Sequence, residues 1–179
     1  MTDELGATTV LIAFCAANCP GSHRMPEARR AARLIVLDSS SRILLFRYVD
    51  ADGRAYWATP GGGVEGGETP EQAAKREAYE ELGATTAKVH KLWNGCAEFH
   101  IDQGLVRQTE TFFLLDCGPL VPGRDVEEAH QAEGIKESRW WTLADIEGSD
   151  ELIFPDDFAT RLRETVPRLQ SASCMRTPP

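Results

Sequence analysis

Short apolar runs separated by polar breaks open the folded part of the chain and predict strands. The runs Ala32–Leu37 and Arg42–Val49 are rich in Ile, Leu and Val, and the polar segment Asp38–Ser41 lies between them. Apolar runs of this length, bounded by turn residues, are typical of strands. A third short strand is expected over Ala55–Thr59, so the fold should begin with strands.

A helix is expected to follow, because every start signal is present in one short segment. The glycine-rich loop Thr59–Gly63 first breaks regular structure. Thr69 then suits the N-cap, Pro70 the first helical position, and Gln72 completes a capping box. Gly83 supplies the stop signal.

The second half of the chain contains further strands and a final helix. Strands on both sides of one central helix, with a helix at the end, favour a mixed β-sheet packed between helices. The predicted fold class is therefore an α/β sandwich. The expected strands are Lys88–Trp93, Cys96–Ile101, Val106–Cys117 and Ser138–Thr142, and the last helix begins at Pro155.

A length of 179 residues fits one compact domain. Residues 31–170 are expected to form it. Residues 1–30 are expected to be a dispensable N-terminal extension that could be disordered, and residues 171–179 a flexible tail. The apolar stretch Thr9–Ala17 is too short to cross a membrane, and acidic residues precede it where a signal peptide carries positive charge. Neither membrane insertion nor export is expected.

Composition and charge narrow the class of protein further. A hydrophobic fraction of 42% with 26% charged residues predicts a folded core. The net charge of −9 opposes binding to a nucleic-acid duplex, which depends on basic surfaces. Polyphosphates can still bind an acidic protein when metal ions bridge the two negative partners. The five cysteines form no CxxC pair and are expected to be reduced thiols of a cytoplasmic protein.

Three carboxylates occupy one face of the predicted helix. Glu77, Glu80 and Glu81 are spaced i, i+3 and i+4, which places them in one narrow sector. Like charges at this spacing cost roughly 0.2–0.5 kcal/mol per pair, and Arg76 can relieve only part of that cost. Oxygen-rich clusters suit hard cations such as Mg²⁺ or Mn²⁺. A solvated acidic face is the simpler alternative for a glutamate pair.

The rest of the helix and its loop show how the carboxylates could be positioned. Ala74, Ala78 and Leu82 form a mainly small apolar stripe beside them, which is expected to pack on the sheet. The glycines before the helix let the backbone approach a ligand or metal without an intervening Cβ. Both features favour a built site over a solvated face.

These residues together form a long motif. Gly62 is followed after five residues by Glu68, and after seven more by the string Arg-Glu-x-x-Glu-Glu-x-Gly that begins at Arg76. In this motif the sequence resembles the Nudix (MutT-like) hydrolase family, and every fixed position matches. Ala78 and Ala84 are the only departures, since the family prefers bulkier aliphatic residues there. The resemblance covers about residues 31–169.

The resemblance implies an activity and a cofactor. Nudix hydrolases cut the diphosphate bond of a nucleoside triphosphate, or of a nucleoside diphosphate linked to another group, by attack of water at phosphorus. They use Mg²⁺, with Mn²⁺ as a substitute. The expected partner is a small-molecule nucleotide or other diphosphate, and the expected state is a monomer or homodimer. The sequence leaves the particular substrate open.

The resemblance also implies roles for individual residues. Glu80 and Glu81 should bind the metal, and Glu77 should be a further ligand or the base that activates water. Arg76 and Glu68 should pair and hold these ligands in position. Further ligands are expected from a backbone carbonyl near Gly61 or Gly62 and from a distant glutamate, for which Glu133 is the best positional match. Competing candidates are Glu98, Glu110, Glu127 and Glu128.

Three residues outside the motif are candidates for substrate binding. Arg47 could contact a phosphate, and Trp57 and Phe99 could stack on a base. Each has a simpler alternative: a surface strand arginine for Arg47, and core packing for the two aromatic residues.

Two rival functions remain to be weighed. Isopentenyl diphosphate isomerase shares the Nudix fold, but its active-site cysteine motif is absent from this sequence. A non-catalytic Nudix-like nucleotide-binding regulatory domain is the second alternative. Such domains usually lose motif glutamates, and this sequence has kept all of them.

Overall fold

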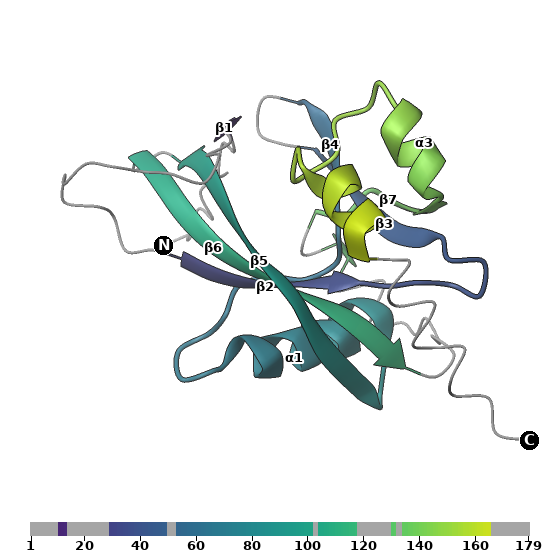
Figure 1. Ribbon diagram of the computed structural model, residues 1–179. Helices are drawn as coiled ribbons and strands as arrows, with labels where there is room; N and C mark the ends of the chain where they lie inside the picture. The colour runs from purple at the N-terminus through teal and green to yellow at the C-terminus, as the bar shows by residue number, and fades with distance from the viewer. Residues whose placement is uncertain are drawn as a thin grey trace, which may run out of the picture.

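The computed structural model describes residues 11–13, 29–49, 53–101, 104–117, 130–131 and 134–165. Figure 1 shows α1 on one side of the crossing strands β2, β5 and β6, while α3 and the last helix lie on the other side, next to β3, β4 and β7. The predicted α/β sandwich is therefore confirmed. The elements are β1 (Leu11–Ala13), β2 (Arg29–Ile35), β3 (Ile43–Val49), β4 (Ala55–Ala58), α1 (Pro70–Leu82), β5 (Ala87–Ile101), β6 (Gly104–Cys117), β7 (Glu137–Trp141) and α3 (Leu143–Gly148), followed by a helix over residues 158–165.

The strands form two sheets. The four-stranded sheet has the order β1-β5-β6-β2, and the three-stranded sheet has the order β4-β3-β7. β2 runs parallel to β6, whereas all other pairs of neighbouring strands are antiparallel. Mixed pairing is thus confirmed, although it is confined to the four-stranded sheet.

Two of the differences from the predicted strands have a structural reason. β2 begins at Arg29 rather than Ala32, because the backbone at Arg29 and Arg30 already pairs with β6 although the side chains are polar. β5 is one long strand through Gly95, where two strands were expected. A Cβ at Gly95 would lie 3.1 Å from the ring of Phe112, so this glycine allows a close approach and does not end the strand.

The helix α1 has the predicted boundaries. The Thr69 hydroxyl accepts a hydrogen bond from the Gln72 backbone amide, the Gln72 side-chain oxygen accepts one from the Thr69 backbone amide, and Pro70 is the first helical residue. Gly83 ends the helix in the left-handed region, at φ 67°. These signals are local, and the start and end of α1 are therefore fixed by its own sequence.

Two hydrophobic clusters pack on the two sides of the sheets. The first joins α1 to the sheets, and the predicted stripe of Ala74, Ala78 and Leu82 is buried in it. The second lies under α3 and the last helix. The first cluster includes Ala32, Leu34, Leu44, Phe46 and Phe113, and the second includes Ile35, Leu45, Trp57, Phe112, Trp141, Phe158 and Leu162.

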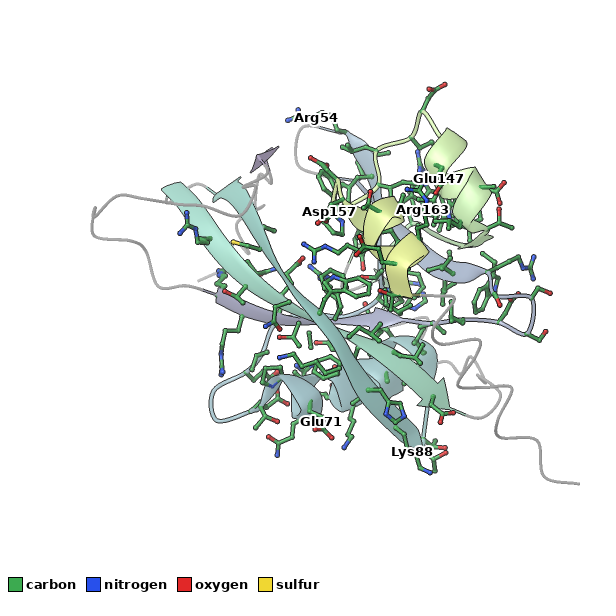
Figure 2. The ribbon with its side chains drawn as sticks, viewed as in Figure 1. Arg54, Glu71, Lys88, Glu147, Asp157 and Arg163 are labelled. Carbon is green, nitrogen blue, oxygen red and sulfur yellow. The ribbon has the colours of Figure 1, made fainter. Side chains whose placement is uncertain are left out.

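The C-terminal part of the described chain differs from the prediction in two ways. β7 ends at Trp141, because Thr142 is the N-cap of α3, a helix that was not predicted. The last helix begins at residue 158, three residues later than expected. Figure 2 shows Glu147 of α3 next to Arg163 of the last helix, and the two side chains form an ion pair.

Several expectations fall on residues outside the described part of the chain. The extension and the tail were predicted at residues 1–30 and 171–179; apart from the short strand β1 and the first two residues of β2, these residues lie outside it, and the proposed division stays a prediction. Of the five cysteines, Cys96 is the one whose side chain is described, and it is not part of a disulfide. Within the described residues, no helix combines the length and apolar character needed to cross a bilayer.

Candidate active site

The glycine-rich loop runs along the free edge of β2. The amide of Leu34 donates to the Pro60 carbonyl at 2.8 Å, and the amide of Ala32 donates to the Gly62 carbonyl at 2.9 Å. Gly63 forms an antiparallel bridge with Ala31. The loop is therefore held like a short extra strand, which fixes the backbone in front of α1.

Both backbone groups of Gly61 are hydrogen-bonded to charged side chains. Its amide donates to Oε2 of Glu81 at 2.5 Å, and its carbonyl accepts from the Arg33 guanidinium at 2.8 Å. Its φ of 125° is a conformation that residues with a Cβ rarely adopt. A Cβ there would also overlap the carbonyl oxygen of Ala32. Position 61 therefore requires glycine on both grounds.

Gly62 lies directly against Glu77. A Cβ at Gly62 would overlap Oε1 of Glu77 and lie 2.9 Å from its carboxyl carbon. The glycines were expected to let the backbone approach a ligand or metal; that stays a prediction, and what Gly62 allows here is a close approach to a carboxylate. The Gly62 carbonyl already accepts the hydrogen bond from Ala32, so its expected part in metal binding would use the second lone pair of that oxygen.

Arg76 connects three carboxylates with the loop. Its Nε lies 3.1 Å from Glu68, and one terminal nitrogen lies 2.8 Å from Glu77 and 2.9 Å from Glu80. The other terminal nitrogen donates to the carbonyl of Gly63 at 2.8 Å. The predicted contact between Arg76 and Glu68 is present. Hydrogen bonds from Arg76 hold the pKa of Glu68 below its usual value, and the same contact raises the pKa of Arg76.

The carboxylates of the three motif glutamates have different partners. Glu77 and Glu80 meet at Arg76, whereas Glu81 turns to the amide of Gly61. In the described part of the chain, no three carboxylate, imidazole or thiol groups converge closely enough, as they stand, to hold a metal ion. The helical spacing therefore places the carboxylates on one face, but their ends do not form a ready-made metal cage.

Burial excludes the solvated-face alternative for two of these glutamates. Glu77 is 3% exposed and Glu81 is 1% exposed, whereas Glu80 faces solvent. A carboxylate removed from water is costly unless cations and hydrogen-bond donors compensate it. The site brings together five carboxylates and three guanidinium groups, so negative charge is in excess. The carboxylates are Glu68, Glu77, Glu80, Glu81 and Glu110, and the guanidinium groups are Arg30, Arg33 and Arg76.

This donor set fits a hard divalent cation. All the candidate side-chain donors are carboxylate oxygens, which Mg²⁺ and Mn²⁺ prefer. The excess of negative charge gives such a cation an electrostatic reason to bind. Glu80 is open to solvent, and this side chain can turn toward an incoming ion without unpacking the core.

The sequence analysis missed Arg33. Its Nε lies 2.9 Å from Glu110, and Gln108 donates to the same carboxylate oxygen at 3.0 Å. Burial lowers the pKa of Arg33, but the neighbouring groups that favour its positive charge, Glu110 foremost, together outweigh burial and the pKa is raised. The available signal was one arginine within the apolar segment Ala31–Val36. Glu110, weighed only as a competing distant ligand, therefore lies next to the loop.

Two of the three substrate-binding candidates, Trp57 and Arg47, have side chains that the structure describes. Trp57 is 1% exposed, its ring contacts Trp141 edge-on, and its Nε1 donates to Glu151 at 2.6 Å. The stacking role for Trp57 was therefore wrong, and the alternative of core packing is correct. In β3, Leu44 and Phe46 face α1, and side chains alternate along a strand, so Arg47 points to the face away from α1. Its backbone pairs with that of Trp57 in β4.

Other predicted site residues are not described, either entirely or in their side chains. Glu133, the candidate distant ligand, is not among the described residues, and neither are Glu127 and Glu128. Phe99 belongs to β5, where its backbone lies across from Val106, but its side chain is not described. Their roles stay predictions.

His130, to which the sequence analysis assigned no role, contacts the end of α1. Its Nε2 lies 2.7 Å from the backbone carbonyl of Glu81. Because a carbonyl only accepts, Nε2 carries the proton. The ring also meets Phe46 edge-on, with centroids 4.8 Å apart. His130 thus satisfies one of the carbonyls that the helix end leaves without an internal partner.

Comparison with known proteins identifies the family of this chain. Residues 27–169 match the NUDIX domain, and the chain therefore belongs to the Nudix family. The fold is shared with a NUDIX hydrolase from Nitrosomonas europaea, at a TM-score of 0.60 and 16% identity over 79% of this chain and 90% of that one. The resemblance in sequence and the resemblance in fold point to the same family.

Two relatives carry names that describe an activity. An RNA pyrophosphohydrolase of Aliivibrio fischeri is 52% identical over 102 residues, which is 50% of this chain and 60% of the relative. An oxidized purine nucleoside triphosphate hydrolase of Danio rerio is 41% identical over 66 residues, which is 37% of this chain and 42% of the relative. The chain thus spans about half the length of the curated relatives it matches.

Proposed function

We propose that this Nudix protein is a Mg²⁺-dependent pyrophosphohydrolase that cuts a diphosphate bond by attack of water at phosphorus. The observation that carries the proposal is the pair of buried carboxylates, Glu77 and Glu81, at a glycine loop where negative charge exceeds positive charge. Buried charge of this kind is unfavourable for the fold alone, and a metal-binding role gives a reason for it.

Each residue of the site has a proposed task. Glu80 and Glu81 bind the cation, and Glu77 is a further ligand or takes a proton from the attacking water. Arg76 keeps Glu77 and Glu80 in place through its contact with Glu68. When bound, the cation lowers the pKa of a water ligand and offsets the charge on the phosphoryl oxygens. Glu133 is proposed as the distant ligand.

A small nucleotide is the proposed substrate class. Both relatives are named for acting on pyrophosphate or triphosphate groups, one on RNA and one on a nucleoside triphosphate. The net charge of −9 opposes contact with a long phosphate backbone. We therefore favour a free nucleotide with a diphosphate or triphosphate group over an RNA end. Arg47 and Phe99 remain candidates for contacting it, and the protein is proposed to act in the cytoplasm.

A substrate panel tests the function. The purified chain is assayed with nucleoside triphosphates, oxidised deoxynucleoside triphosphates, ADP-ribose, nucleotide sugars, diadenosine polyphosphates and a 5′-triphosphorylated RNA oligomer, with Mg²⁺, with Mn²⁺ and with EDTA. We expect metal-dependent release of a monophosphate from at least one small nucleotide. Glu80→Gln is the matched variant, because Glu80 is exposed and its replacement should leave the core intact. Turnover that persists in EDTA or in Glu80→Gln contradicts the assigned site.

The alternative of a non-catalytic nucleotide-binding regulatory domain gives a different outcome in the same panel. Such a domain would bind a nucleotide without cleaving it under any metal condition. The presence of Glu77, Glu80 and Glu81 favours the enzyme, because a purely binding domain has no need for the full set. Binding without turnover across the whole panel would decide for the regulatory domain.

A further inference from the structure

We propose that Arg33 is a positioning residue of this site: it fixes the glycine loop at Gly61 and thereby places the metal-binding carboxylate of Glu81. The inference rests on the proposed function, in which Glu81 binds the cation. Arg33 lies in β2, outside the motif, and its role is carried by contacts that join residues far apart in the sequence.

Gly61 is held by two side chains that reach it from opposite faces of the sheet. Ala32 and Leu34 pack against α1, so Arg33, between them in β2, points away from α1. Glu81 reaches the Gly61 amide from α1, and Arg33 reaches the Gly61 carbonyl from the other face. The backbone at Gly61 therefore links the Arg33 guanidinium to the Glu81 carboxylate.

Arg33 is itself held in one orientation. Nε donates to Glu110 at 2.9 Å while a terminal nitrogen donates to Gly61 at 2.8 Å, and Gln108 supports Glu110. Glu110 is 6% exposed and cannot easily exchange this contact for water. A guanidinium serves two acceptors in different directions from one rigid plane, which the single ammonium of lysine does not reproduce. The chain of contacts thus runs from Glu110 through Arg33 and Gly61 to Glu81.

This arrangement predicts what loss of Arg33 would do. Without the guanidinium, the Gly61 carbonyl loses its charged donor and Glu110 loses its cation. The loop can then shift, and the amide that orients Glu81 shifts with it. Supporting contacts of this kind typically change metal affinity about 10–100-fold. Arg33 is not assigned a contact with substrate, so metal binding should suffer more than substrate binding.

The experiment compares Arg33→Met and Arg33→Lys with Arg29→Met. Arg29 lies in the same strand and is exposed, which makes its replacement a matched control for loss of charge. Mn²⁺ binding to each protein is measured by isothermal titration without substrate. We expect affinity about 10–100-fold weaker in Arg33→Met, an incomplete recovery in Arg33→Lys, and little change in Arg29→Met. Wild-type affinity in a folded Arg33→Met protein would overturn the proposal.

Two further readouts separate positioning from other roles. Hydrogen exchange of the Gly61 amide, measured by NMR in EDTA, should be at least about tenfold faster in the Arg33 variants than in Arg29→Met. The reason is that the loop, without the contact from Arg33, no longer holds this amide steadily against Glu81. This readout needs no metal, so it tests the contact between Arg33 and Gly61 even if the chain binds no Mn²⁺, an outcome that would contradict the proposed function.

In the turnover assay, the Mg²⁺ concentration that gives half activation should rise in the Arg33 variants. A rise confined to the substrate KM would show direct substrate contact and overturn the positioning role.

Discussion

Gly62 and Glu77 touch so closely that the glycine has no room for a Cβ: an added carbon would overlap the carboxylate oxygen and lie 2.9 Å from the carboxyl carbon. We expect Gly62→Ala to displace Glu77 and to lower Mg²⁺-dependent turnover about 10–100-fold, as changes to supporting contacts of metal ligands do. The obstacle is the end of a flexible side chain, so the fold should persist. Steady-state kinetics and circular dichroism measure the two effects.

Gly63→Ala is the control for this prediction. Gly63 follows directly in the same loop, and a Cβ there would meet nothing within 4 Å. Its turnover should stay near that of the unsubstituted chain. Equal losses in Gly62→Ala and Gly63→Ala would show that the loop needs flexible glycines in general and would remove the specific link to Glu77.

Glu68 offers a second prediction, because it holds Arg76 from outside the group of proposed metal ligands. Glu68→Gln removes the charged partner of the Arg76 Nε, 3.1 Å away. Turnover should fall about 10–100-fold, while Mg²⁺ binding should weaken but persist. Titration with Mn²⁺ and kinetics at saturating metal separate the two. Complete loss of metal binding would make Glu68 a direct ligand instead of a supporting residue.

Two buried tryptophans allow a third prediction, about stability. The Nε1 of Trp57 donates to Glu151, whereas the Nε1 of Trp141 is buried without a hydrogen-bond partner among the residues that are described. Trp57→Phe should therefore cost about 0.5–1.5 kcal/mol more in the free energy of unfolding than Trp141→Phe, the net value of one hydrogen bond, because Glu151 is exposed and keeps its contact with Arg139. Urea unfolding of both variants measures the difference. A cost for Trp141→Phe equal to that for Trp57→Phe would show that this hydrogen bond contributes little.

The stability of the fold should depend on pH through its carboxylates. The pKa of Glu151 is lowered chiefly by the hydrogen bond from Trp57, and the pKa of Glu68 chiefly by those from Arg76. A lowered folded-state pKa gives stability that is present above the unfolded value, about 4.3 for glutamate, and is lost as pH falls through the folded value. Urea midpoints measured between about pH 3 and 7 should fall on the acid side of that unfolded value. Glu151→Gln should make the urea midpoint depend less steeply on pH. An unchanged pH dependence would show that Glu151 does not contribute to it.

Addition of Mg²⁺ should stabilise the folded chain. A ligand present at 100 times its Kd and bound only to the folded state adds about 2.7 kcal/mol. The thermal midpoint should therefore rise with Mg²⁺ and return to its lower value in EDTA. Glu81→Gln should abolish both the rise and Mg²⁺-dependent turnover. A midpoint that rises equally in Glu81→Gln would place the bound ion elsewhere.

Sequence predicted the local features of this fold and missed those that depend on distant pairing. The helix from Pro70 was predicted to the residue, since its capping box and its terminal glycine lie within the helix and its flanks. The strand β5 was divided in two, because Gly95 resembles a break until Phe112 is seen packed against it. The ion pair between Arg33 and Glu110 joins residues 77 positions apart and arises only from the parallel pairing of β2 with β6.

The active-site prediction shows the same division. Helical spacing placed Glu77, Glu80 and Glu81 on one face, but it could not predict that Glu81 would turn to the Gly61 amide while Arg76 gathered the other two. Those directions depend on the loop lying along β2, which is a tertiary contact. Trp57 was misjudged for the same reason, because its burial depends on Trp141 and on the elements that cover both rings.

The helix that carries the site has its charges arranged against its own dipole. Glu80 and Glu81 occupy the last turn of α1, where the helix end is partly negative, and no basic residue lies in that turn. A carboxylate so placed is disfavoured by roughly 0.3–1 kcal/mol, whereas a cation there is favoured by a similar amount. A divalent ion bound by these glutamates would supply the positive charge that favours a helix C-terminus, which no basic residue of the last turn supplies. Binding of the ion would therefore relieve an unfavourable charge at the end of α1 as well as serve the chemistry.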